Sequence, residues 1–318
     1  MPSLSFWMCS GRISPPRICK ARSPNITGAN AATGCAPDVT ETTTSKPEGA
    51  AAPRPWRDLG PRGASAAVLI PIAVFGIWSG GVVWDVLVGV AVVLLSWEWA
   101  RFCKISIWRW PGLLMPAISL VVMLLAAFGP PLAAIGVLAA GTLLLFLLQR
   151  NGDIWPAAGL FYIGLAGFSL VLLRGEDHAG LLNTLFMVLI VWASDTGAYV
   201  AGRALGGPKL APAISPGKTW SGAAGGLLAA TLIGAGAAAL LAPGGASRAA
   251  AIAAMLGVMS QAGDLLESAI KRRFGVKDSS SLIPGHGGML DRLDGVMAAA
   301  PMATALALLA GRGMPLWH

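Results

Sequence analysis

The sequence has 318 residues, of which 55% are hydrophobic and only 12% are charged, and its mean hydropathy is +0.68. These values exclude an ordinary soluble domain and predict that most of the chain lies in lipid. The formal net charge of +8 does not indicate nucleic acid as a partner. The basic residues fall in short segments between long apolar runs, where they orient a membrane protein.

The N-terminal segment, residues 1–60, is rich in Pro, Ser, Thr and Gly. It has too little apolar surface to fold alone, so we expect a disordered polar tail followed by one membrane-embedded domain over residues 61–318. A cleavable signal peptide is not expected, because no apolar stretch of about 7–15 residues follows the first charges. A transit peptide and a start codon assigned too far upstream stay open as alternatives.

Nine apolar windows follow the tail, and a helix needs roughly 20 mainly apolar residues to cross a bilayer. The windows are 64–79, 82–100, 110–128, 131–148, 155–173, 181–200, 220–241, 248–266 and 294–311. They predict an all-α, polytopic transmembrane helical bundle of about nine spans. The first window is short and can merge with the second as a hairpin, so the predicted count carries an error of one.

The basic residues predict the orientation of these spans. With a cytoplasmic N-terminus and nine alternating spans, only Arg174, Arg248 and Arg312 of the 23 Lys and Arg residues fall on the outer side. This asymmetry is what the positive-inside tendency produces. We therefore expect the N-terminus in the cytoplasm and the chain in a bacterial cytoplasmic (inner) membrane.

Carboxylates gather at one predicted membrane face, beside two long polar loops at 201–219 and 267–293. An ionisable residue in a span costs about 2.5–3.5 kcal/mol on insertion scales, so it usually faces a cavity or a partner. Five acids lie at the cytoplasmic ends of the sixth, eighth and ninth spans: Asp195, Asp264, Glu267, Asp291 and Asp294. The sequence predicts that they converge.

The eighth helix is expected to continue through Lys271, because Asp264, Glu267, Ser268 and Lys271 then share one face at spacings of three, four and seven. Further cations, a glycine-rich stretch at 284–288 and a pair of acids at the start of the last helix follow. Phosphoryl and nucleotidyl transfer need positioning and charge neutralisation, and Mg²⁺ takes one or two protein carboxylates together with substrate phosphates. The pattern favours a metal–nucleotide site.

Two ordered motifs resemble those of the phosphatidate cytidylyltransferase family. The first comprises Ser268-Ala269-Ile270-Lys271-Arg272, Lys277-Asp278 and Pro284-x-His286-Gly287-Gly288-x-x-Asp291-Arg292-x-Asp294. The second comprises Ser194-Asp195-Thr196-Gly197-Ala198-Tyr199, Gly202-Arg203, Lys209-Leu210-Ala211-Pro212 and Ile214-Ser215-Pro216-x-Lys218-Thr219-Trp220. The resemblance runs from about Trp56 to the C-terminus. Two positions depart from the family pattern: Gly217 replaces a frequent basic residue, and Ser221 replaces a common Glu.

The resemblance implies a magnesium-dependent membrane enzyme in which the phosphate of phosphatidic acid attacks the α-phosphorus of CTP and expels pyrophosphate. It implies Asp264 and Asp291 as metal ligands and as catalytic residues together with Lys271 and Asp294. The implied substrate-binding residues are Arg272, Lys277, His286, Gly287, Gly288, Arg292, Asp195, Ser215 and Lys218. CTP, phosphatidic acid and the bilayer are the implied partners, and a second cation and a homodimer stay open.

Two other functions are compatible with the sequence. A CTP-dependent lipid kinase would transfer the γ-phosphate to a polyprenol-type alcohol, and an ion-coupled transporter would use intramembrane acids as ion sites. A transporter predicts acids near the bilayer midplane, whereas these acids cluster at one face. Asp85 and Glu98 lie beside Trp84, Trp97 and Trp99. An interfacial aromatic belt explains these two acids as well as a functional role does.

Overall fold

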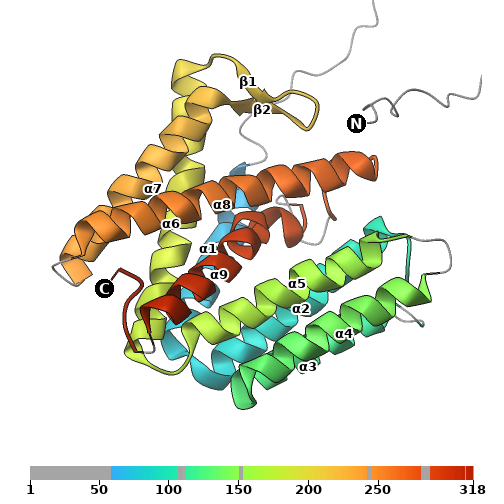
Figure 1. Cartoon of the computed structure of the whole chain (residues 1–318). Helices are drawn as coiled ribbons and strands as arrows, with labels where there is room; N and C mark the ends of the chain where they lie inside the picture. Colours follow the sequence, from blue (N-terminus) through green and yellow to red (C-terminus); the bar gives the residue numbers. More distant parts are fainter. Residues whose placement is uncertain are drawn as a thin grey trace, which may run out of the picture. The chain divides into compact units, whose positions relative to one another are not determined.

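Figure 1 shows the computed structural model of the chain, which describes residues 59–106, 110, 112–149, 153–241, 245–280, 287–311 and 313–317. Almost all of the predicted N-terminal tail lies outside the described residues, and so does His286. The described part contains nine helices and one two-stranded sheet. The predicted all-α fold class is therefore confirmed.

The helices follow the predicted apolar windows in chain order. They are α1 (Leu59–Ser79), α2 (Gly81–Phe102), α3 (Leu114–Phe128), α4 (Pro131–Leu148), α5 (Trp155–Arg174), α6 (His178–Leu205), α7 (Trp220–Leu241), α8 (Ala246–Arg273) and α9 (Leu290–Ala310). Seven of the described helices are long and apolar enough to cross a membrane. The protein is thus an integral membrane protein, while the count of nine spans and the cytoplasmic N-terminus stay predictions.

Two apolar cores organise the helices of residues 59–317. The first lies among α2 to α5 and includes the fully buried side chains of Trp99, Met115 and Leu160. The second lies among α6 to α9 and includes Met187 and Leu256. The long helix α5 packs on both α9 and α6, and it joins the two groups of helices (Figure 1).

Helices α8 and α9 cross at very short range. A Cβ atom on Gly263 of α8 would lie 2.5 Å from the carbonyl oxygen of Asp294 and 2.6 Å from the Cβ of Ala298, both on α9. Only glycine fits such a contact, and small residues are the usual means by which membrane helices approach closely. Because Asp264 follows Gly263 directly, this crossing brings the acids of the two helices to the same level.

The loop predicted at 201–219 is shorter and more ordered than expected. Helix α6 continues to Leu205, and the chain then forms an antiparallel hairpin of β1 (Lys209–Ala211) and β2 (Ser215–Thr219). The guanidinium Nε of Arg272 on α8 donates to the carbonyl oxygen of Ile214, at 3.1 Å. The hairpin is therefore attached to the end of α8.

The other predicted loop, 267–293, is likewise shortened by helices. Helix α8 continues to Arg273, which confirms the predicted extension through Lys271. Helix α9 begins at Leu290, so Asp291 and Asp294 both lie in its first turns, as predicted. The connection between these helices is consequently limited to residues 274–289.

The close crossing of α8 and α9 predicts that Gly263→Ala destabilises the protein. The added methyl group overlaps the backbone of α9, and overpacking of this kind costs about 1–3 kcal/mol. Thermal unfolding of the purified protein in detergent measures the change. Gly136→Ala in α4 is the matched control, because a Cβ at Gly136 meets no atom within 4 Å. Equal midpoints for the two variants would contradict the tight crossing.

Candidate functional site

A polar cavity of about 340 Å³ opens where α6, α8 and α9 meet. Its lining residues, within the described part of the chain, are Asp195, Asp264, Glu267, Lys271, Asp278, Asp291, Arg292 and Asp294. All five acids that the sequence predicts to converge are among them. The lining carries six carboxylates and two cations, so the cavity is strongly acidic.

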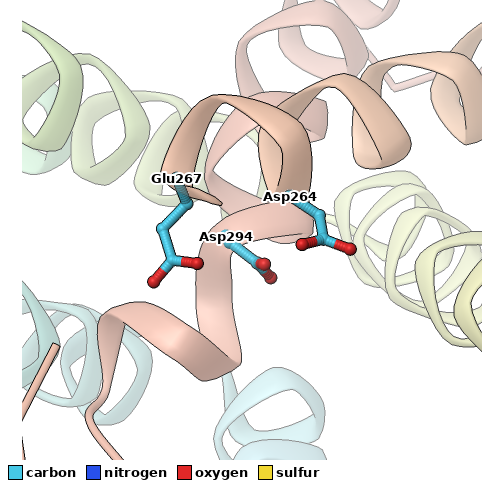
Figure 2. Close-up of side chains that lie close together, drawn as sticks. All are labelled: Asp264, Glu267 and Asp294. Atoms are coloured by element: carbon cyan, nitrogen blue, oxygen red, sulfur yellow. The ribbon is translucent and has the colours of Figure 1, made fainter. Parts of the chain in front are cut away.

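Three carboxylates form the tightest group in this cavity. One oxygen from each of Asp264, Glu267 and Asp294 lies within 4.8 Å of the other two. Asp264 and Glu267 project from successive turns of α8, whereas Asp294 comes from α9 (Figure 2). We call these residues the carboxylate triplet. Oxygen ligands at this spacing can hold a metal ion.

Glu267 provides an independent test of whether a cation fits the triplet. Its side chain is only 3% exposed, and its Oε2 pairs with the ammonium of Lys271 at 2.7 Å. Its Oε1 is buried and has no hydrogen-bond partner among the described residues. A buried carboxylate oxygen without a partner is costly, and a cation bound at the triplet would supply the missing interaction. The donor set therefore fits a hard cation.

Lys271 joins the triplet to Asp291. Its ammonium lies 2.7 Å from Glu267 and 2.6 Å from Asp291 Oδ1, and its side chain is 14% exposed. The family resemblance implies that Lys271 is a catalytic residue. In the structure the ammonium group of Lys271 already pairs with two carboxylates. These contacts fix the orientation of the Lys271 side chain in the lining of the cavity.

Both oxygens of Asp291 are engaged. Oδ1 pairs with Lys271, and Oδ2 accepts hydrogen bonds from the backbone amide of Ser279 at 3.0 Å, the hydroxyl of Ser279 at 2.8 Å and the amide of Gly288 at 2.9 Å. Asp291 thus shares the cavity with Asp264, as expected, but lies outside the triplet. Its predicted role as a metal ligand stays a prediction.

The hairpin closes one side of the site through Lys218. Its ammonium lies 2.6 Å from Asp264 Oδ2, and both side chains are partly exposed. Ser215 lies at the start of the same strand, β2. Nearby, the Ser221 hydroxyl donates to the carbonyl oxygen of Gly206, so this departure from the family pattern has a local partner.

Some of the remaining predicted site residues line the cavity, and others lie outside its lining. Asp195 and Arg292 line the cavity, from α6 and α9 respectively. Arg272 and Lys277 are exposed at its periphery and do not appear in the lining of the described part. Gly287 has a φ of +80°, a conformation that favours glycine, and it leads into the buried Gly288.

Sequence reasoning left two residues of this region without a role. Glu267 was among the converging acids but was not assigned to the site, although it belongs to the triplet. Glu98 was explained equally well by an aromatic belt, yet it is fully buried and bonded to the segment that leads into α9. The available signal was a carboxylate between Trp97 and Trp99 near the end of an apolar span.

Comparison with known proteins gives a consistent result. Residues 61–310 match the cytidylyltransferase family. A phosphatidate cytidylyltransferase from Brucella suis is 43% identical over 250 residues, which cover 75% of this chain and 89% of that protein. Proteins of the same name from Pseudomonas aeruginosa and Bacillus subtilis are 38% identical over 285 residues and 36% identical over 215 residues. They cover 79% and 67% of this chain, and 97% and 76% of their own lengths.

The matched region begins at the first described helix and ends at the last, so it contains the cavity, the triplet and the hairpin. The resemblance inferred from the two motifs is confirmed over the same part of the chain. This chain belongs to the cytidylyltransferase family.

Proposed function

We propose that this protein transfers the cytidylyl group of CTP to phosphatidic acid and forms CDP-diacylglycerol and pyrophosphate. The observation that carries the proposal is the carboxylate triplet with its flanking Lys and Arg residues, set in a helical membrane chain that is 43% identical to a phosphatidate cytidylyltransferase. Such a site can receive a water-soluble nucleotide and a lipid headgroup together.

The reaction exchanges one phosphoanhydride bond for another. An oxygen of the phosphatidate phosphate attacks the α-phosphorus of CTP, the bond from the α-phosphorus to the bridging oxygen of the β-phosphate breaks, and pyrophosphate leaves with that oxygen. The protein orients the two phosphates in line and neutralises the charge that develops on the leaving group.

The cations around the cavity would receive the substrate phosphates. Arg292 lines the cavity and can hold a phosphate bidentately, while Arg272 and Lys277 lie at its periphery, where the pyrophosphate portion of CTP would extend. Lys218 extends from the hairpin and pairs with Asp264, which lines the cavity. We assign Lys218 to the nucleotide phosphate nearest Asp264, and Lys271 to the fixed wall between the triplet and Asp291.

We assign Mg²⁺ to the triplet, with Asp264 and Asp294 as its main ligands and Glu267 beside them. Asp291, the second ligand implied by the family resemblance, is the alternative partner of Asp264, and a second cation stays open. Bound Mg²⁺ would polarise the phosphoryl oxygens and offset their negative charge. Six carboxylates in the lining repel a free triphosphate, so the charge of the cavity itself favours a nucleotide that arrives with a divalent cation.

The bacterial cytoplasmic membrane is the proposed location, because CTP is cytoplasmic and the named relatives are bacterial. The triplet lies toward the C-terminal end of α8 and the N-terminal end of α9. In the predicted orientation both of these ends face the cytoplasm. A homodimer stays a prediction.

The proposed reaction predicts distinct products from two labelled nucleotides. With phosphatidic acid and Mg²⁺, CTP labelled at the α-phosphorus should place its label in a CDP-lipid, and CTP labelled at the γ-phosphorus should release labelled pyrophosphate. Thin-layer chromatography of both reactions measures this. Transfer of the γ-label to a lipid alcohol, with CDP as the other product, would support the lipid-kinase alternative and refute the proposal.

The metal assignment predicts that Asp264→Asn and Asp294→Asn each lower kcat/KM by on the order of 100-fold or more, because ligands of the charge-stabilising cation are lost. We also expect Mg²⁺ without substrate to raise the thermal midpoint of the wild type, and both variants should lose this rise. Asp291→Asn should keep that rise if Asp291 lies outside the metal shell.

Asp177→Asn is the matched control for these variants. Asp177 caps the N-terminus of α6, where its side chain accepts from the amide of Gly180, and Asn caps helices about equally well. Its kinetics should equal those of the wild type. If Asp291→Asn loses the Mg²⁺ effect while Asp294→Asn keeps it, the family-implied ligand pair is right and the triplet is not the metal site.

The contact between Lys218 and Asp264 predicts opposite effects of Lys218→Gln on two constants. The Mg²⁺ concentration for half-maximal activity should fall, because Asp264 loses a competing cation, and the KM for CTP should rise, because a phosphate contact is lost. Steady-state kinetics measure both. Lys209→Gln, which neutralises an exposed lysine on β1, is the control. If both constants stay unchanged in Lys218→Gln, Lys218 does not belong to the site.

A further inference from the structure

Glu98 is a fully buried carboxylate near the end of α2, with 0% of its surface exposed. Burying a carboxylate among membrane helices is costly unless its oxygens are hydrogen-bonded. Its neighbours Trp97 and Trp99 are aromatic, and the Trp99 side chain is itself buried. The position of Glu98 therefore requires partners from other parts of the chain.

The partners among the described residues come from the connection between α8 and α9 and from Leu290, the first residue of α9. Oε1 accepts from the hydroxyl of Ser280 at 2.6 Å and from the amide of Met289 at 2.8 Å. Oε2 accepts from the hydroxyl of Ser279 at 3.1 Å and from the amide of Leu290 at 2.7 Å. Three of these donors serve Glu98 alone, whereas the single proton of the Ser279 hydroxyl is shared with Asp291. Glu98 thus fastens α2 to both described ends of this connection.

Glu98 also supplies the N-terminal cap that α9 lacks. The residue at the N-cap position is Met289, whose side chain makes no capping hydrogen bond within the described part of the chain. The first amides of a helix have no partner within the helix, and a negative charge at that end is stabilised by the helix dipole. The carboxylate of Glu98 meets both requirements from a helix about 190 residues earlier in the chain.

The same segment fixes Asp291. Ser279 approaches both acids, because its hydroxyl lies 3.1 Å from Glu98 Oε2 and 2.8 Å from Asp291 Oδ2. Gly288 donates its amide to Asp291, and a Cβ on Gly288 would overlap with Ser279 and Glu98. Asp291 in turn pairs with Lys271, which pairs with Glu267. A continuous chain of polar contacts therefore runs from Glu98 to the carboxylate triplet.

We propose that Glu98 is a positioning residue for cytidylyl transfer, which sets the start of α9 and thereby the places of Asp291 and Asp294. Glu98 does not appear in the lining of the cavity in the described part of the chain, so it acts through these residues and not on the substrates. The inference rests on the proposed function. It adds a requirement for α2, which contributes no lining residue among those described.

Glu98→Gln is the principal test, because the amide keeps the size of the side chain but replaces one acceptor oxygen with a donor that faces other donors. A misplaced reacting group costs about 100-fold in rate when the displacement is near 1 Å. We therefore expect kcat to fall about 100-fold while the KM for CTP changes less than about threefold. Hydrogen–deuterium exchange at the amides of residues 287–293 should become faster, without substrate present.

Two further variants complete the experiment. Ser280→Ala removes one of the four donors and should cause a smaller change in both kcat and exchange, in the same direction. Glu176→Gln, at an exposed glutamate between α5 and α6, is the matched control and should change neither. If Glu98→Gln does not fold, Ser280→Ala decides the question: unchanged kcat and unchanged exchange would overturn the proposal.

Other outcomes also overturn it. A wild-type kcat in folded Glu98→Gln would remove the residue from the reaction, and a loss of kcat with unchanged exchange at 287–293 would show that Glu98 does not act by positioning α9. If the wild type forms no CDP-lipid, the proposed function fails. The exchange measurement still tests whether Glu98 holds the start of α9, because it requires no turnover.

Discussion

A carboxylate buried among membrane helices is tolerated only when its oxygens find hydrogen-bond donors or cations, and this constraint organises the polar region of the protein. Among the described residues, Glu98 meets it with the hydroxyl of Ser280 and two backbone amides, and Asp291 meets it with two backbone amides and Lys271. The hydroxyl of Ser279 lies between the two acids and shares its one proton with them. Glu267 meets it on one oxygen only. The other oxygen of Glu267 lies in the carboxylate triplet, beside Asp264 and Asp294, so a cation bound at the triplet would supply the interaction that this oxygen needs.

The two groups of helices play different parts in this arrangement. Helices α6, α8 and α9 carry five of the six acids that line the cavity in the described part of the chain, and the close crossing at Gly263 sets the distance between α8 and α9. Helices α2 to α5 surround an apolar core that also receives Ile270 from α8 and Leu290 from α9. Helices α6, α8 and α9 thus supply the acidic side chains of the site. Helices α2 to α5 fix the ends of α8 and α9, from which these side chains project.

Much of this architecture was predictable from the sequence, because it depends on local patterns. Apolar windows predicted the helices in order, and the spacing of Asp264, Glu267 and Lys271 predicted a shared face on a continued helix, which the structure confirms. The family motifs predicted the region of the site. The order of the helices and the shared face on α8 can be predicted from helical periodicity and the length of a bilayer span alone.

The remaining features depend on contacts between distant segments. Nothing near Glu98 in the sequence indicates that its partners are Ser279, Ser280 and two amides about 190 residues away. The pairing of Lys218 with Asp264 likewise requires a hairpin that single-sequence periodicity did not predict in so short a polar segment. Charge and hydropathy show that a buried acid needs a partner, but only tertiary packing selects which one.

Two of the donors to Glu98 are backbone amides, and this has a consequence for how the protein can change during evolution. The amides at positions 289 and 290 persist under any substitution except proline, so the bond to Glu98 places almost no demand on those side chains. The selective pressure for these two bonds then falls on position 98 in α2. The side chain at position 289 can therefore change without loss of this contact, provided that the carboxylate opposite it is retained.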